Sequence, residues 1–254
     1  MSSADFSKLC DHYNPCEQII IFLRSWFLGL FVRVAILSSG GKDSASAWWW
    51  AICQGWDVEF LVTMCVTSGD SMMFQVPGTG IVEHQARLAG VEWICLETDG
   101  SEDTEIDDLE VGIKSLGIDA LVTGALRSDY QKSKIERMCH RLGIISYNPL
   151  WHQSPQNHLT DLVSNGFGVM ITSVACEGLD HTWIGKILDN ESLSQLIDLS
   201  DQFRFNVDGE GGEYETIVIS GPHFNGHIQI DGQVKWYGRR GELIIDSVSL
   251  SLDG

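Results

Sequence analysis

The hexapeptide SGGKDS at residues 39–44 is the stretch that decides how this chain folds. The apolar run Val32–Leu37 precedes it and a helical pattern follows, an order that predicts a strand, a tight turn and a helix. Its two adjacent glycines let the backbone curl and approach a ligand closely. The helix after the turn begins with free N–H groups at the positive end of its dipole. The turn is therefore suited to bind an anion.

The side chains of the hexapeptide add charge and hydrogen-bonding groups to this turn. Lys42 supplies a cation, and Asp43 is a candidate Mg²⁺ ligand or helix cap. Ser39 and Ser44 add hydroxyl donors. The GxxxxGK[ST] pattern of a Walker A loop is absent. The sequence thus predicts a polyphosphate site of a different kind.

From residue 32 onward, apolar strand-like runs alternate with helical patterns. We predict strands at Val32–Leu37, Val58–Val66, Glu92–Leu96 and Asp119–Thr123, and helices at Ser44–Gln54, Thr79–Ala89, Glu102–Leu116 and Asp129–Arg141. Strands separated by helices of this length indicate βαβ units and a parallel sheet. Ligands of such sheets lie at the carboxyl ends of the strands. The segments Ser39–Ser44, Thr67–Met73 and Gly124–Tyr130 all fall at that edge.

The pattern changes beyond residue 150. Helices are predicted at Gln156–Asn165 and Ser192–Gln202, and strands at Phe167–Val174, Tyr214–Ser220, His227–Tyr237 and Glu242–Leu252. Strands without intervening helices indicate an antiparallel or mixed second sheet. Asp231-Gly232 is a strong two-residue hairpin signal. We therefore predict an α/β fold, with a parallel-sheet domain at residues 32–146 and a smaller α+β domain at 147–254 that packs over its ligand-binding face.

Composition limits the classes of partner. The chain has 254 residues, of which 44% are apolar, and a formal charge of −19 that is spread over both halves. Such a field repels a phosphate backbone, so extended contact with nucleic acid is disfavoured. The apolar run Ile19–Phe31 is interrupted by Arg24 and is too short to span a bilayer. We interpret residues 1–31 as an extension without assigned function, in preference to a docking helix.

The seven cysteines include no CxxC pair. Cys53, Cys65 and Cys95 lie in apolar patterns and are predicted to be buried thiols. This usage favours a reducing cytoplasm and no structural zinc. The histidines show no spacing typical of metal ligands, so we predict no metal site built on them.

A second motif, DGEGGEYET at residues 208–216, interleaves glycines with acids. Taken alone, it could be a solvated acidic loop. SGGKDS resembles the PP-loop of the ATP pyrophosphatases. Together with the second motif, GPHF at 221–224 and GALRSDYQ at 124–131, it resembles the diphthine–ammonia ligase family. The resemblance runs from about Val32 to Phe224, and shorter matches occur at 137–139, 142–143 and 149–151.

The resemblance implies a PP-loop domain with helices on both faces of its sheet. It also implies an ATP-dependent amidation that completes diphthamide, a modified histidine of translation elongation factor 2. ATP, with Mg²⁺, would adenylate the carboxylate of diphthine, and ammonia would displace AMP after pyrophosphate has left. No glutaminase signature is recognised, so free ammonium is the expected nitrogen source. The implied protein is cytoplasmic and acts on neither nucleic acid nor membranes.

The resemblance also implies roles for single residues. Nucleotide binding is expected from the PP-loop and one later glycine, namely Ser39, Gly40, Gly41, Lys42, Asp43, Ser44 and Gly124. Catalytic roles are expected for Lys42, Asp43, Glu210 and Glu213, with Asp43 also the Mg²⁺ ligand. Substrate contacts are expected from Tyr130, Gly211, Gly212 and Tyr214. The aromatic faces of Tyr130, Trp151 and Tyr214 could attract the trimethylammonium group of diphthine, although core packing is the simpler role for each of them. Helix packing is the expected role of Trp48–Trp50.

Other classes remain open at this point. A tRNA-modifying PP-loop enzyme would carry basic RNA-binding surfaces, and thiolases among them often carry cysteine pairs, neither of which this sequence favours. A relative that amidates a small carboxylic acid is another alternative. A non-catalytic nucleotide-binding module is disfavoured by the Lys42-Asp43 pair and the second glycine–glutamate motif. The sequence does not predict an oligomeric state.

Overall fold

The computed structural model describes residues 32–66, 80–101 and 104–252. The extension at 1–31, the edge segment Thr67–Met73 and the predicted first residues of the 102–116 helix lie outside the described residues. Within the described ones, no helix is long and apolar enough to cross a membrane.

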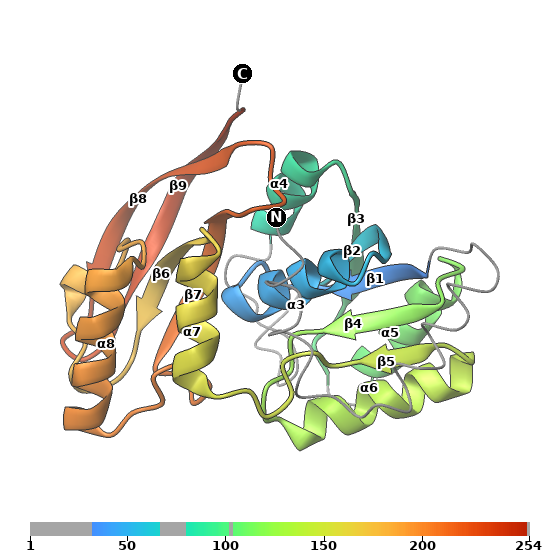
Figure 1. The fold of residues 1–254 in the computed structure, drawn as a ribbon, viewed down its shortest axis with the longest axis horizontal. Helices are drawn as coiled ribbons and strands as arrows, with labels where there is room; N and C mark the ends of the chain where they lie inside the picture. The colour runs from blue at the N-terminus through green and yellow to red at the C-terminus, as the bar shows by residue number, and fades with distance from the viewer. Residues whose placement is uncertain (1–31, 67–79, 102–103, 253–254) are drawn as a thin grey trace.

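The first sheet is parallel and has five strands in the order β3-β2-β1-β4-β5 (Figure 1). The strands are β1 (Arg33–Leu37), β2 (Asp57–Val66), β3 (Glu92–Thr98), β4 (Ala120–Thr123) and β5 (Ile145–Tyr147). The helices between them are α3 (Lys42–Cys53), α4 (Ile81–Ala89), α5 (Glu105–Lys114) and α6 (Asp129–Leu142). The interior strand β4 is buried along its whole length, as expected for a sheet covered on both faces.

Two clusters of buried side chains cover the two faces of this sheet. One joins α3 and α4 to the sheet and continues into the second half of the chain, and the other joins α5 and α6 to the opposite face. In the first cluster Trp50 stacks on Tyr147, with ring centroids 4.8 Å apart. Trp48 is also buried, so the predicted helix-packing role of Trp48–Trp50 is confirmed for these two residues. The predicted fold class is confirmed as well.

The second sheet is antiparallel, with the order β7-β6-β9-β8. Its strands are β6 (Gly168–Val174), β7 (Tyr214–Ser220), β8 (His227–Trp236) and β9 (Gly241–Ser251). The helices α7 (Pro155–Ser164) and α8 (Asn190–Phe203) lie side by side against this sheet, and a short 3₁₀ helix, η1 (His181–Trp183), follows β6 (Figure 1). Placing the boundary between two domains in the segment that joins the two sheets remains a proposal.

The hairpin predicted at Asp231-Gly232 is wrong. The strand β8 continues through both residues, and the register with β9 shifts there because Asp231 faces Ser247 whereas Gly232 faces Ile245. This is a β-bulge, and a Cβ atom on Gly232 would lie 2.4 Å from the Ile244 carbonyl oxygen. The chain reverses further on, where Gly238 adopts a φ of +89° that suits glycine.

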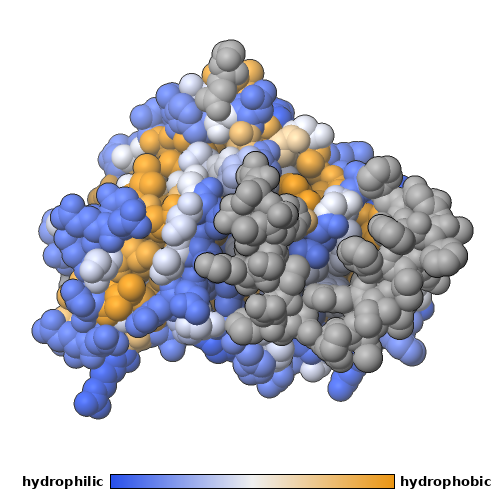
Figure 2. All heavy atoms as spheres, in the orientation of Figure 1, coloured by the Kyte–Doolittle hydropathy of each residue, from blue (hydrophilic) through white to orange (hydrophobic). Residues whose placement is uncertain are grey.

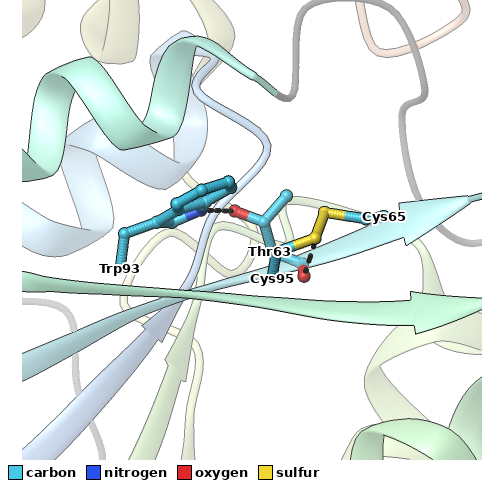
Figure 3. The surroundings of a disulfide bond; sticks show 4 residues. All are labelled: Thr63, Cys65, Trp93 and Cys95. Carbon is cyan, nitrogen blue, oxygen red and sulfur yellow. Dashed lines mark hydrogen bonds between the residues drawn. A yellow bond between two sulfur atoms is a disulfide. The ribbon is translucent and has the colours of Figure 1, made fainter.

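The prediction of buried thiols at Cys65 and Cys95 is also wrong. The two residues form a disulfide between the neighbouring strands β2 and β3, with their Cα atoms 5.8 Å apart (Figure 3). Cys95 is exposed because β3 is the edge strand of its sheet. Beside the bridge, the indole N–H of Trp93 donates to the Thr63 hydroxyl at 3.0 Å. Cys53 remains a free, half-buried thiol.

The two sheets meet at the PP-loop. The amide of Val218 on β7 donates to the carbonyl of Gly40 at 2.9 Å. The buried amide side chain of Gln85 on α4 donates to both carbonyls of this junction, at 2.9 Å to Gly40 and 2.8 Å to Val218. The second sheet is therefore attached directly to the loop that the sequence singles out.

Candidate functional site

A cavity of about 350 Å³ lies at the carboxyl ends of β1 and β4. These neighbouring strands are the point at which the strand order reverses, where α/β sheets bind their ligands. The volume is within the range of small-molecule sites. Both halves of the chain line it. The first contributes residues 37–39, 41–44, 63–64, 123–126, 128, 131 and 135, and the second contributes residues 209, 210, 212 and 214–216.

Two glycines shape the wall around the PP-loop. Gly40 has a φ of +83°, and a Cβ atom there would lie 2.4 Å from a methyl group of Ile81. Gly40 turns toward α4 and β7 and does not line the cavity, so its role is to bend the loop. Gly124 lies so close to the start of α3 that a Cβ atom would be 2.6 Å from the Asp43 carbonyl carbon. Only glycine fits there, which keeps β4 beside the first turn of the helix.

Lys42, Asp43 and His158 form a chain of polar contacts. The Lys42 ammonium lies 2.9 Å from Oδ2 of Asp43. The other carboxylate oxygen, Oδ1, accepts a hydrogen bond from Nε2 of His158 at 2.7 Å. His158 comes from α7 and is completely buried. Asp43 does not cap the helix. The N-cap residue of α3 is Gly41, and no side chain makes a capping hydrogen bond there. The capping role suggested for Asp43 is therefore wrong.

The electrostatics of this pair favour full ionisation. Burial by itself would raise the pKa of Asp43, but the Lys42 charge and the His158 hydrogen bond lower that pKa to about 2. Burial would likewise lower the pKa of Lys42, but Asp43, with help from Glu210 and Asp208, raises that pKa above its ordinary value. At neutral pH the cavity thus has a buried ammonium beside a fixed carboxylate.

Residues of β7 form the opposite wall. The hydroxyl of Thr216 accepts a hydrogen bond from the amide of Lys42 at 3.2 Å, which ties β7 to the first residue of α3. The ring of Tyr214 faces the Lys42 ammonium at 5.8 Å, and its hydroxyl donates to the Val207 carbonyl at 2.6 Å. Glu215 also lines the cavity. Burial, with the nearby negative charges of Asp43 and Glu210, raises the pKa of Glu215 to about 7 despite the Lys42 charge.

A buried ion pair holds the acidic loop against the first sheet. Asp208 is fully buried, and its carboxylate accepts two hydrogen bonds from the guanidinium of Arg127 in the segment between β4 and α6. The amide of Glu210 lies 3.5 Å from the same carboxylate. Glu210 therefore enters the cavity from a loop that Arg127 positions. Burial, together with Asp43 and Asp208, raises the pKa of Glu210.

Glu213 has a different environment from Glu210. Its Oε1 accepts from the amide and side-chain nitrogens of Asn206, at 2.9 and 2.7 Å, and its Oε2 accepts from the Gly211 amide at 2.7 Å. It does not line the cavity. Its observed contacts hold the glycine loop in shape, and we do not propose a contact between Glu213 and the reacting groups.

The cavity brings together most of the predicted site residues. Those that line it are Ser39, Gly41, Lys42, Asp43, Ser44, Gly124, Glu210, Gly212 and Tyr214. Those outside its lining are Gly40, Tyr130, Gly211 and Glu213. For the residues that line the cavity, the predicted roles in binding and catalysis remain proposals. For the residues outside the lining, we do not propose these roles again.

The three aromatic faces considered for a quaternary ammonium already face lysines. Lys134 lies 4.1 Å from the ring centroid of Tyr130, and Lys132 lies 5.0 Å from that of Trp151. Tyr214 faces Lys42, as described above. A substrate cation would meet repulsion at each face, so the acidic groups of the cavity are the better candidates to attract it.

Four residues with clear positions at the site had no predicted role: His158, Asp208, Glu215 and Thr216. Three of them lie inside the DGEGGEYET motif. The motif therefore indicated this region, but it did not show which of its acids face the cavity. His158 had no local signal, because its contact with Asp43 spans 115 positions of the chain.

The donor groups at the cavity fit Mg²⁺ when it is bound with a nucleotide. Mg²⁺ prefers carboxylate, hydroxyl and phosphate oxygens, and it usually keeps several waters. Asp43 supplies a carboxylate that is ionised throughout the neutral range, and Ser44 a nearby hydroxyl. Among the described residues, no group of three or more His, Cys, Asp or Glu side chains could hold a metal alone. The ion would therefore need phosphate oxygens of the nucleotide.

Comparison with known proteins identifies the relatives of this chain. Residues 32–146 match the family model of the diphthamide synthase N-terminal domain, and residues 154–250 match that of its C-terminal domain. The chain belongs to the diphthamide synthase family. The family predicted from the PP-loop and the glycine–glutamate motif is thereby confirmed.

Relatives of this diphthamide synthase family member carry the name diphthine–ammonia ligase. The protein of Schizosaccharomyces pombe is 31% identical over 217 residues, which cover 78% of this chain and 36% of that one. The human protein is 30% identical over 223 residues, which cover 79% of this chain and 83% of that one. The chain thus spans about a third of the fission yeast protein and most of the human one.

A solved structure from Methanocaldococcus jannaschii, described as a predicted subunit of a tRNA methyltransferase, is also similar. It is 18% identical with a TM-score of 0.43, and the match covers 75% of this chain and 98% of that one. A likeness this low has no bearing on the function of the diphthamide synthase family member described here.

Proposed function

We propose that this protein is an AMP-forming ligase that uses ATP and ammonium to amidate diphthine on translation elongation factor 2. Family membership supports the reaction class. The observation that carries the proposal is the shared cavity, which is lined by the Lys42-Asp43 pair at the start of α3 and by Glu210 and Glu215 of the second half. One cavity thus has a cation that can bind phosphates and carboxylates that can bind a nitrogen nucleophile.

The first step activates the acceptor. A carboxylate is a poor electrophile, so its oxygen attacks the α-phosphorus of ATP and the bond to pyrophosphate breaks, leaving an acyl-adenylate. Lys42 stabilises the negative charge that develops on the phosphate oxygens, and it is already fixed by Asp43 before substrate binds. The first turn of α3 adds N–H groups at the positive end of its dipole.

The second step forms the amide. Ammonium first loses a proton, ammonia attacks the acyl carbon, and AMP leaves with the electron pair of the broken C–O bond. The nitrogen then loses a second proton to give the neutral amide. Glu215 is our candidate to accept protons, because a general base works best with a pKa near the working pH. Glu210 would attract the ammonium ion and the trimethylammonium group of the acceptor.

Asp43 would hold Mg²⁺ when the nucleotide is bound, and the ion would supply neutralisation of phosphate charge. Protection from water falls to the protein, because an acyl-adenylate hydrolyses readily. The loop before β7, anchored by the Arg127–Asp208 pair, covers one side of the cavity and is our candidate for that role. We also propose a cytoplasmic location because elongation factor 2 acts there; the Cys65–Cys95 disulfide removes the support that cysteine usage gave to this location.

The proposal is tested by incubating the protein with ATP, Mg²⁺, ammonium and elongation factor 2 that carries diphthine. We expect AMP and pyrophosphate in equal amounts with new diphthamide, and ATP–pyrophosphate exchange when ammonium is left out. Formation of ADP and phosphate would show that the PP-loop assignment is wrong. Modification of tRNA with none of elongation factor 2 would overturn the acceptor.

A lysine pair provides the matched variants. Lys42→Ala should lower turnover by about 10²–10³, the usual effect of losing one preorganised charge-stabilising group. Lys114→Ala removes an equal charge from the exposed end of α5 and should leave turnover unchanged. Equal turnover in the two variants would leave the loop as a structural turn.

A further inference from the structure

The turn between β8 and β9 is a basic and aromatic feature that the proposed reaction does not use. We define the basic turn as residues 235–240, with the sequence KWYGRR. All six residues are exposed, including Trp236 at 36% and Tyr237 at 57% of their full accessible surface. Large aromatic side chains together with arginine are typical of the centres of protein interfaces.

The charge of this turn opposes that of its surroundings. Only five Lys or Arg residues occur after residue 146, and three of them, Lys235, Arg239 and Arg240, lie in the basic turn. The same part of the chain contains 15 Asp or Glu residues. On the visible face, the second half of the chain carries hydrophilic patches beside a hydrophobic strip (Figure 2). A local cluster of cations in a chain of formal charge −19 is therefore a specific feature and does not follow from the average composition.

The turn also has a defined shape. The amide of Tyr237 donates to the Arg240 carbonyl at 2.8 Å, and the Tyr237 hydroxyl donates to Glu242 at 3.1 Å. The ring of Trp236 lies over Gly241, where a Cβ atom would be 2.5 Å from a carbon of the indole. The His181 ring of η1 is 6.1 Å from the indole. Preorganised side chains lose less conformational entropy on binding than mobile ones.

Sheet register relates the basic turn to the cavity. Val174 of β6 faces Tyr214 on one side and Gly241 on the other, and Gly241 faces Trp236. In the adjacent row, Ser173 faces both Glu215 and Glu242, and Glu242 faces Lys235.

Tyr214 and Glu215 line the cavity, so the turn and the cavity wall lie at the same edge of the second sheet. Within each row, three strand spacings of about 4.8 Å separate the residue on β7 from the residue on β8, roughly 14 Å in all.

A protein whose side chain enters the cavity would reach the turn as well. A stable protein interface covers about 800 Å² on each partner, a patch roughly 30 Å across, so an interface centred on the cavity reaches a point roughly 14 Å away. Such a contact would also suit the proposed chemistry. The acidic groups of the cavity repel the carboxylate of the entering residue, so other contacts are needed to hold that residue in place. Contacts away from the cavity can provide that binding energy.

We propose that the basic turn docks an acidic surface of the acceptor protein and so holds the diphthine-bearing residue at the cavity. This inference rests on the proposed function for the identity of the acceptor. An RNA partner is the less favoured choice, since the net charge of the chain repels a phosphate backbone at long range.

The test compares two double charge reversals of equal size. Arg239→Glu/Arg240→Glu changes the basic turn, whereas Lys114→Glu/Arg137→Glu changes exposed positions of α5 and α6. We expect the first variant to raise the KM for diphthine-bearing elongation factor 2 by about 10- to 100-fold, through slower association and a loss of salt dependence. Its kcat at saturation and its KM for ATP should match those of the control. Equal acceptor KM values for the two variants would overturn the proposal.

Two further measurements separate this inference from the proposed function. Equilibrium binding of the same acceptor protein is measured without ATP. If the wild-type protein forms no diphthamide but binding is weakened only by the turn variant, the docking surface stands and the proposed function fails. If the turn variant binds a single-stranded RNA oligonucleotide more weakly than the wild-type protein does, while the acceptor KM is unchanged, the partner is RNA and the docking proposal fails. Arg239→Gln/Arg240→Gln replaces the reversal should the latter not fold.

Discussion

Nε2 of His158 on α7 lies 2.7 Å from Oδ1 of Asp43 on α3, although the two residues are 115 positions apart. The contact ties helix α7 to the first turn of α3. It also leaves Oδ2 of Asp43 to the Lys42 ammonium, at 2.9 Å. The Nδ1 atom of His158 has no hydrogen-bond partner among the described residues. The one hydrogen bond that the described His158 side chain makes is therefore to Asp43, and it fixes how the carboxylate is turned.

Substitution of His158 should therefore lower turnover through Asp43. We expect His158→Ala to reduce kcat by about 10- to 100-fold, the usual effect of losing a residue that orients a ligand or catalytic group. The KM for the acceptor should change little. His158→Gln, whose amide can donate to the same oxygen, should recover part of the loss. Steady-state kinetics with separate kcat and KM values measure this.

The control for His158 is Leu162→Ala on the same helix. Leu162 is buried, so this variant should lose about 2–5 kcal/mol of stability without a selective loss of kcat in the folded protein. Equal kcat values for His158→Ala, His158→Gln and Leu162→Ala would mean that His158 only contributes to packing.

Glu210 and Glu213 should respond differently to loss of their charge. Glu213→Gln replaces an oxygen that accepts from the Gly211 amide, so we expect a loss of about 1–2 kcal/mol in stability and a lower melting temperature. Glu210→Gln should leave the melting temperature unchanged and lower the rate of amide formation. Thermal melts and single-turnover assays of both variants provide the comparison. Unchanged melting of Glu213→Gln with a selective loss of amidation would restore it to the reaction.

Glu215 should produce an acid limb in the pH profile of amidation. Its pKa is raised to about 7 by burial and nearby carboxylates, so the ionised form that accepts a proton is lost as the pH falls below about 7. The rate at low pH should then fall about tenfold per pH unit. Glu215→Gln should be slower at pH 8 and should lack this limb.

Glu191→Gln, at the exposed start of α8, serves as the control for Glu215. It should keep both the rate and the limb of the wild-type protein. An acid limb that persists in Glu215→Gln would assign the titration to another group.

His223 should make stability depend on pH. Burial among Trp48, Trp49 and Phe224 lowers its pKa from 6.5 to about 3. Between these values the unfolded chain binds a proton that the folded protein does not bind. Stability is therefore fully present above about pH 6.5 and falls by about 1.4 kcal/mol per pH unit as the pH drops toward 3.

His223→Phe should remove this part of the acid dependence, as measured by denaturant unfolding between pH 7 and pH 4. His227→Phe, on the exposed start of β8, should retain it. If both variants followed the wild-type curve, the acid sensitivity would originate elsewhere in the protein.

Local sequence was sufficient for features that depend on neighbours along the chain. The strand before SGGKDS and the helix after it follow from periodicity and two glycines, and the structure has β1 and α3 there. The strand predicted at Tyr214–Ser220 coincides with β7. The three-residue strand β5 was missed because three residues are too few to show a period. At Asp231-Gly232, a turn signal that is usually reliable was overridden by continuous pairing with β9.

By itself, the sequence determined the fold class, the PP-loop, the family and the residue types available at the site. The fold class follows from hydrophobic spacing, whereas the PP-loop and the family follow from the resemblance of short motifs, and both signals act over a few residues. Only the tertiary structure decided which acids face the cavity, because Glu210 and Glu213 are equivalent in the motif until Asn206 and Gly211 bind one of them. It alone placed His158 on Asp43 and the basic turn beside the cavity wall, since these contacts depend on how two sheets pack and pair over distances that no local pattern encodes.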